Sequence, residues 1–169
     1  MKILDNVLTP PTYKKCANKL QELMLQKVWG VSRLGWDKGL LKGVSGDTSM
    51  TLLDDELAAV VLDEIGMHLP KADELMMQFY IWHPYSGIAP HNDGSFEFGA
   101  TIYLNHSWPT EAGGLFVWWE DETDLVMKAI CPSKNMMVLN DEKQRHMVTQ
   151  VSPYIQEPRC TIQIWGMKA

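Results

Sequence analysis

Arg159-Cys-Thr-Ile-Gln-Ile-Trp165 alternates between apolar residues and polar or aromatic ones over its whole length. Because successive side chains of an extended chain point to opposite faces, this period predicts a β-strand. One face carries Arg159, Thr161, Gln163 and Trp165, and the other carries Cys160, Ile162 and Ile164. A polar face that includes an arginine indicates that this side of the strand lines a cavity, whereas the apolar side belongs to a core.

Two earlier segments also have the character of strands. Gly99-Ala-Thr-Ile-Tyr-Leu-Asn105 alternates in polarity and leads to turn residues at Trp108-Pro109 and Gly113-Gly114. Met136-Met-Val-Leu-Asn140 is a short apolar run. From Leu75 onwards the chain has the pattern of short strands separated by Pro, Gly and Asn turns. This pattern predicts a mainly β fold of the jelly-roll or barrel type.

The first 75 residues favour helices and loops over strands. We expect a first helix that is capped at Thr9 and has Pro10 at its first position. A second helix is expected to open at Asp54 or Asp55 and to end at Gly66 and Pro70. Apolar residues recur at helical spacing in both, at Tyr13, Ala17, Leu20 and Met24 and at Leu57, Val60, Val61 and Ile65. The glycine-rich residues 28–50 are expected to form loops and short strands. We expect the helices to lie on a sheet.

His91-Asn-Asp93 brings an imidazole and a carboxylate to the same side of an extended segment, because residues i and i+2 share a face. His146 follows the charged loop 141–145 and begins a further expected strand. Two imidazoles and one carboxylate can occupy one face of an octahedral Fe(II), which leaves three positions open. The other histidines, His68, His83 and His106, are alternative second imidazoles, but the spacing and the following strand favour His146.

Taken together, these residues resemble the Fe(II)- and 2-oxoglutarate-dependent oxygenases, and within them the prolyl 4-hydroxylase-like branch. The resemblance covers roughly residues 76–166. Its signatures in chain order are His91-x-Asp93, Thr101-Ile-Tyr-Leu-Asn105 with Trp108 and Gly113-Gly114, His146-x-Val148, and Arg159 with Trp165. The specificity comes from the ensemble of signatures, since each one alone is weak.

The resemblance implies a role for each matching side chain. It implies His91, Asp93 and His146 as the catalytic iron ligands and Arg159 as the residue that binds the distal carboxylate of 2-oxoglutarate. A guanidinium suits this role because its planar fork matches a carboxylate and keeps its charge when buried. Tyr103 and Thr161 are the implied second anchors of the same carboxylate.

The chain departs from the pattern of this branch in two places. The gap between His146 and Arg159 is a few residues longer than usual, so residues 152–158 are expected to form a wider loop. A histidine, His83, also stands near the place where many relatives have a cosubstrate-binding tyrosine. Tyr80, Tyr85 or His83 itself can take that position.

The resemblance further implies a double-stranded β-helix, a cupin-like jelly-roll, with flanking helices. We expect a single oxygenase domain over residues 1–169, in which residues 1–75 are a helical and loop buttress and residues 76–166 form the core with the site. The implied cofactors are Fe(II), 2-oxoglutarate and O2, with ascorbate as an accessory that the resemblance allows.

The implied reaction is hydroxylation of a C–H bond, with release of succinate and CO2. The expected substrate is a prolyl or other residue of a peptide or protein. The alternatives are a free amino acid or small metabolite as the substrate, or a non-catalytic cupin-like metal-binding protein. A zinc hydrolase is a weaker alternative because no extra carboxylate is obviously placed as a base.

Composition limits the remaining function classes. The net charge of −6 and the lack of a Lys/Arg cluster argue against nucleic-acid binding. Three cysteines without paired spacing argue against a disulfide framework or a structural zinc site. The chain shows neither an apolar stretch of membrane-spanning length nor the apolar region of a secretion signal, so we expect a soluble, cytoplasmic protein. The sequence does not indicate an oligomeric state.

Overall fold

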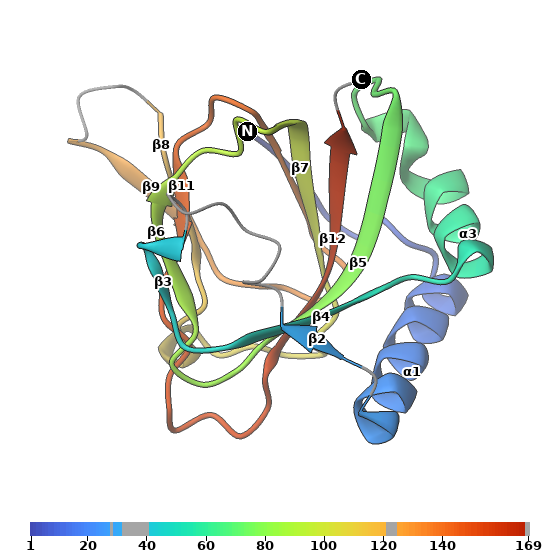
Figure 1. The fold of residues 1–169 in the computed structure, drawn as a ribbon, viewed down its shortest axis with the longest axis horizontal. Coiled ribbons are helices and arrows are strands. Elements are labelled where there is room, and N and C mark those ends of the chain that lie inside the picture. Colours follow the sequence, from blue (N-terminus) through green and yellow to red (C-terminus); the bar gives the residue numbers. More distant parts are fainter. Residues whose placement is uncertain (28, 32–40, 121–124, 168–169) are drawn as a thin grey trace.

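Two antiparallel β-sheets face each other, and helices cover the outer face of the larger one (Figure 1). The computed structural model describes residues 1–27, 29–31, 41–120 and 125–167. The larger sheet has the strand order β1-β10-β7-β12-β5-β4-β2, and the smaller has the order β3-β6-β11-β8-β9. This two-sheet arrangement is the mainly β jelly-roll predicted from the alternating segments.

The larger sheet consists of β1 (Lys2–Leu4), β10 (Met137–Asp141), β7 (Phe96–Tyr103), β12 (Arg159–Met167), β5 (Glu74–Trp82), β4 (Thr48–Leu52) and β2 (Gly30–Val31). The smaller consists of β3 (Val44–Ser45), β6 (Gly87–His91), β11 (His146–Val148), β8 (Phe116–Trp119) and β9 (Met127–Ile130). The short strands expected within residues 28–50 are therefore β2, β3 and the start of β4; residues 28 and 32–40 lie outside the described part of the chain.

Helix α1 (Pro10–Gln26) begins at the predicted proline, but Thr9 does not cap it. The Thr9 and Thr12 hydroxyls instead donate hydrogen bonds to Glu64 Oε1, at 2.8 and 2.6 Å. These bonds connect the start of α1 to the second helix. The buried stripe of α1 includes Tyr13, Cys16 and Leu20, whereas Met24, expected on this stripe, is exposed.

Helix α3 (Asp55–Ile65) has the predicted start, because the Asp54 carboxylate accepts a hydrogen bond from the backbone N–H of Leu57 at 2.9 Å. It buries Leu57, Val61 and Ile65. The helix ends at Ile65, and a 3₁₀ turn, η2 (Gly66–His68), follows. A second 3₁₀ turn, η3 (Thr110–Ala112), precedes the predicted Gly113-Gly114 turn. In the residues that the structure describes, no helix is long and apolar enough to cross a membrane.

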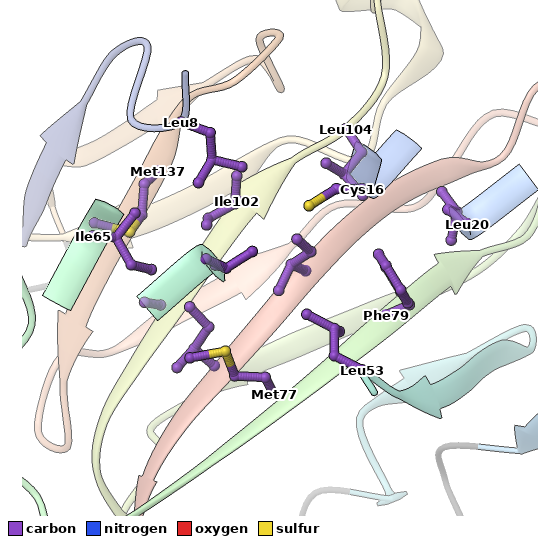
Figure 2. Close-up of a cluster of buried hydrophobic side chains, with 14 of the residues drawn as sticks. Leu8, Cys16, Leu20, Leu53, Ile65, Met77, Phe79, Ile102, Leu104 and Met137 are labelled. Carbon is purple, nitrogen blue, oxygen red and sulfur yellow. The ribbon is translucent and has the colours of Figure 1, made fainter. Parts of the chain in front are cut away.

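Strand β12 lies at the centre of the larger sheet and pairs with β5 on one side and β7 on the other. Its apolar face contributes Cys160, Ile162 and Ile164 to a cluster beneath the two helices. Figure 2 shows this cluster, in which Cys16 and Leu20 of α1 and Ile65 of α3 lie over sheet residues that include Phe79 and Met137. The opposite face of β12 turns toward the smaller sheet. The predicted division of this strand into two faces is what separates the core from the cavity.

Candidate active site

His91 and His146 are cross-strand neighbours at the edge of the space between the sheets. His91 ends β6, His146 begins β11, and the two are directly paired in the register of these strands. Their ring centroids are 4.3 Å apart, and the ring of Phe116 on β8 stacks on His146 at 5.1 Å. Strand pairing therefore brings together two residues that are far apart in the chain.

Both imidazoles are oriented by local hydrogen bonds. The Nδ1 of His91 lies 2.8 Å from the carbonyl of Ala89, and the Nδ1 of His146 lies 2.8 Å from the carbonyl of Gln144. Because a carbonyl can only accept, each Nδ1 carries the proton and each Nε2 keeps its lone pair for a metal.

Both Nε2 atoms face Asp93. They lie 3.6 Å (His91) and 3.5 Å (His146) from the carboxylate oxygens of Asp93. The potential ligand atoms of the three side chains all lie within 4.8 Å of one another. This donor set fits Fe(II). His68, His83 and His106 are not part of this cluster.

The Asp93 carboxylate is held by a residue that the sequence did not single out for this purpose. Asn140 on β10 donates a hydrogen bond from Nδ2 to Asp93 Oδ2 at 2.8 Å, and both side chains are buried. Gly99, the partner of Asn140 across β7 and β10, leaves room for this pair. A Cβ at Gly99 would lie 3.1 Å from Asp93 Oδ2 and 3.2 Å from Asn140 Oδ1.

A cavity of about 390 Å³ extends from the three side chains into the space between the sheets. Its size lies within the usual range for small-molecule sites. The wall near the triad includes Phe96 and Trp165, whose rings stack at 4.4 Å. Arg159 also lines the cavity. The predicted polar face of β12 therefore lines a cavity, as its alternation indicated.

Arg159 is almost completely buried, with 1% of its surface exposed. Its guanidinium lies 5.2 Å from the ring of Trp82 and 5.0 Å from the ring of Tyr103, and Nη2 is 3.5 Å from the Tyr103 hydroxyl. Its Nε has no hydrogen-bond partner, and no carboxylate of the described residues pairs with it. Burial lowers the pKa of Arg159 and raises that of Tyr103. A buried cation without an anion is costly.

Two neighbours fix the place of Arg159. Gly114 has a φ of +62°, and a Cβ there would lie 2.8 Å from Arg159 Cδ, so the arginine side chain occupies the space of a missing side chain. Asn105 accepts a hydrogen bond from the Cys160 N–H at 2.7 Å and donates one to the Pro158 carbonyl at 2.9 Å. The Asn105 side chain thus anchors the end of the loop 152–158 where β12 begins.

The other residues predicted to contact 2-oxoglutarate differ in whether they line the cavity. Tyr103 and Thr161 are buried and paired across β7 and β12, but neither is among the residues that line the cavity, and the Thr161 hydroxyl has no partner. Of the three alternatives for the tyrosine position, Tyr80 lines the cavity, His83 is 2.8 Å from the Ser49 hydroxyl, and Tyr85 is 57% exposed.

Comparison with known proteins agrees with this geometry. Residues 75–167 match the model of the 2OG-Fe(II) oxygenase superfamily, which is more than half of the chain. A sequence comparison with curated proteins gave no match. The chain belongs to the 2OG-Fe(II) oxygenase superfamily, with an HxD…H triad at His91, Asp93 and His146. Fe(II) and 2-oxoglutarate are accordingly the cofactor and cosubstrate that family and triad together imply.

Solved structures of similar fold include prolyl hydroxylases and an enzyme of nogalamycin biosynthesis. A Pseudomonas putida prolyl-4-hydroxylase has a TM-score of 0.72 at 13% identity, with 99% of this chain and 92% of that chain covered. A Trichoplax adhaerens prolyl hydroxylase, in complex with a hypoxia inducible factor peptide fragment, has a TM-score of 0.73 at 15% identity, with 99% and 83% covered. The carbocyclase SnoK from nogalamycin biosynthesis has a TM-score of 0.70 at 14% identity, with 99% and 79% covered. At these identities the likeness establishes the double-stranded β-helix fold alone.

Proposed function

We propose that this chain is a 2-oxoglutarate-dependent dioxygenase that hydroxylates a C–H bond. In this proposal His91, Asp93 and His146 bind Fe(II), and Arg159 binds the distal carboxylate of 2-oxoglutarate with Tyr103 and Thr161 as second anchors. The proposal also treats residues 1–169 as one oxygenase domain, with residues 1–75 as the buttress of the core. The contacts of α1 and α3 with the outer face of the larger sheet support this last point.

The observation that carries the proposal is the buried guanidinium of Arg159, which lies in the same cavity as the triad and has no carboxylate partner among the described residues. An arginine in this position is destabilising for a protein that only stores a metal, because its charge lacks a partner. A ligand with a carboxylate at the far end from the metal supplies that partner and forms charge-assisted hydrogen bonds. This argues against the non-catalytic cupin-like alternative.

The protein's own residues orient the reactants and exclude water. When bound, iron and 2-oxoglutarate supply with O2 the oxidation in which 2-oxoglutarate becomes succinate and CO2 and the substrate gains a hydroxyl group. The hydrogen bonds to Ala89, Gln144 and Asn140 hold the three ligand side chains in place for this chemistry. The carboxylate of Asp93 favours hydroxylation over halogenation, because related halogenases lack this ligand to make room for a halide.

For the substrate, we propose a prolyl or other residue of a peptide or protein. The fold's likeness to two prolyl hydroxylases, one of them in complex with a peptide fragment, supports this choice. The likeness to a carbocyclase of nogalamycin biosynthesis supports a small molecule as the second candidate.

An anaerobic titration tests the cofactor assignment. Fe(II) followed by 2-oxoglutarate should give the visible charge-transfer band of the chelate in the wild type, and Asp93→Ala and His146→Ala should lose it. Arg159→Lys should weaken 2-oxoglutarate binding and leave iron binding intact, because lysine offers no planar fork. Iron binding without any band in the wild type would support the metal-binding protein instead.

Succinate release tests the substrate assignment. A pool of proline-containing peptides and a pool of free amino acids and small metabolites are supplied separately with Fe(II), 2-oxoglutarate and O2. Stimulation above the uncoupled background by peptides alone supports the peptide substrate, and stimulation by the second pool alone contradicts it. Asp93→Ala is the control for oxidation that does not depend on the site.

A further inference from the structure

Gln163 lies on the cavity face of β12, between Arg159 and Trp165. Trp165 pairs with Gly99, which lies against Asp93, so this end of the strand is level with the triad. Arg159 is six residues away along the same strand. Gln163 is therefore two residues from the level of the triad and four from the arginine, and it lines the cavity that contains both.

The carboxamide of Gln163 is held in one orientation. The Thr101 hydroxyl, on the neighbouring strand β7, donates a hydrogen bond to Gln163 Oε1 at 2.7 Å. Because of this bond, the Oε1 atom of Gln163 points toward Thr101, and the Nε2 group with its two N–H donors points away from Thr101. No acceptor for Nε2 is found among the described residues, although the residue lines the cavity.

Gln78, the partner of Gln163 across β5, provides a comparison. Its Nε2 contacts the sulfur of Met50 at 3.3 Å, and its Oε1 accepts from the Tyr80 hydroxyl at 3.3 Å. Both ends of this second amide have partners within the protein. Of the two paired glutamines, Gln163 is therefore the one whose side-chain N–H donors are available to a ligand.

We infer that Gln163 is a cosubstrate-binding residue: its Nε2 donates a hydrogen bond to the 2-oxoglutarate carboxylate at the iron end, and Thr101 holds it in position. This inference rests on the proposed function, in which 2-oxoglutarate spans the triad and Arg159. The position near the level of the triad assigns Gln163 to the carboxylate beside the keto group. Arg159 is left with the distal one.

The test compares two ligands by anaerobic titration of the Fe(II) protein, with the charge-transfer band as readout. 2-Oxoglutarate has both carboxylates, whereas 2-oxobutyrate has the keto-acid end alone. Gln163→Met, which keeps the shape but removes the donor, should weaken both ligands by about tenfold or more. Arg159→Met should weaken 2-oxoglutarate and leave 2-oxobutyrate unchanged. Iron affinity should stay the same in both variants.

Two further variants sharpen the result. Gln163→Glu keeps an acceptor for Thr101 but places a negative charge beside the ligand, so it should weaken both ligands more than Gln163→Met. Gln78→Met is the matched control in the same pair of strands and should leave both affinities within about twofold. Thermal unfolding of each variant establishes that it is folded, and Gln163→Glu serves in place of Gln163→Met if the latter is not.

The outcomes separate this inference from the proposed function. Unchanged affinities in Gln163→Met, a loss restricted to 2-oxoglutarate, or an equal loss in Gln78→Met would each overturn the role of Gln163 and leave the oxygenase assignment intact. A wild-type protein that binds iron but neither ligand would overturn both.

Discussion

The two faces of the larger sheet have the same strands but opposite properties. On the outer face, Ile162 and Ile164 of β12 are completely buried in the apolar cluster that also contains residues of α1 and α3. On the inner face, the same strand exposes Gln163 to a cavity and buries the charged Arg159, which has no anionic partner within residues 1–27, 29–31, 41–120 and 125–167. Alternate residues of one strand therefore serve different purposes: those on the outer face stabilise the fold, and those on the inner face are available to a ligand. Substitutions on the two faces should therefore have separable effects.

The largest expected effect is on metal binding and belongs to the inner face. Asp93→Ala removes the only carboxylate of the triad, so affinity for Fe(II) should fall by more than about a hundredfold. The free energy of unfolding of the metal-free protein should fall by about 1–3 kcal/mol at most, because the buried Asn140 amide loses its acceptor. Metal titration and urea unfolding measure the two quantities, with Asp73→Ala as a control on the surface. A large loss of stability would contradict the division between the faces.

The next effect is the reverse and belongs to the outer face. Ile162→Ala opens a cavity in the cluster beneath the helices and should lower the free energy of unfolding by about 2–5 kcal/mol. Iron and 2-oxoglutarate affinities, measured well below the unfolding transition, should remain those of the wild type. Weaker ligand binding in the folded variant would mean that the outer core also sets the geometry of the site.

A smaller effect is expected at Arg159, where a substitution should raise the free energy of unfolding instead of lowering it. Arg159→Met removes a buried charge that has no anion in the described residues, so the metal-free protein should become more stable by about 1–3 kcal/mol. Urea unfolding in the absence of 2-oxoglutarate is the measurement. Added 2-oxoglutarate with iron should then stabilise the wild type more than the variant. A less stable variant would contradict this prediction. It would mean that the contacts of the Arg159 guanidinium with the rings of Trp82 and Tyr103 stabilise the protein more than its buried charge destabilises it.

A further expected effect concerns pH and again the outer face. Burial raises the pKa values of the Cys16 and Cys160 thiols to about 12, from an ordinary value of 9.0. Since the folded state holds these protons more tightly, their contribution to stability is complete below pH 9 and is lost as the pH rises toward 12. Unfolding measured from pH 8 to 11 should show this decline, and Cys16→Ala should make it shallower. An identical slope in the variant would contradict the assignment.

Much of the fold could be predicted because its signals are local. The alternation in residues 159–165 and 99–105 identified β12 and most of β7, although β7 begins earlier, at Phe96. The Asp54 cap was predictable for the same reason, since it bonds to a residue three positions away. Thr9 illustrates the limit: its hydroxyl donates a hydrogen bond to Glu64 on another helix and accepts none from a backbone N–H of the helix that it precedes.

The candidate site was predictable where the residue type itself carries the chemistry, as for the histidines, Asp93 and Arg159. The residues that support them could not be found in this way. Asn140 lies 47 positions from Asp93, and Gly114 meets Arg159 only through the path of the chain between the sheets. Such contacts depend on which strands pair and in what register, and neither is written in a local pattern. Gln163 was placed on the cavity face, but its bond to Thr101 required the pairing of β7 and β12.

The carbonyl groups that hold His91 and His146 lie only two residues before each histidine, at Ala89 and Gln144. The hydrogen bond that orients each imidazole therefore lies within three consecutive residues, from the carbonyl to the histidine. A pair of antiparallel strands in an unrelated scaffold, given these two tripeptides in the same register, should acquire two preoriented imidazoles. The two histidine ligands could thus be transferred to another scaffold. The buried Arg159 could not, because its place depends on residues of several strands and loops.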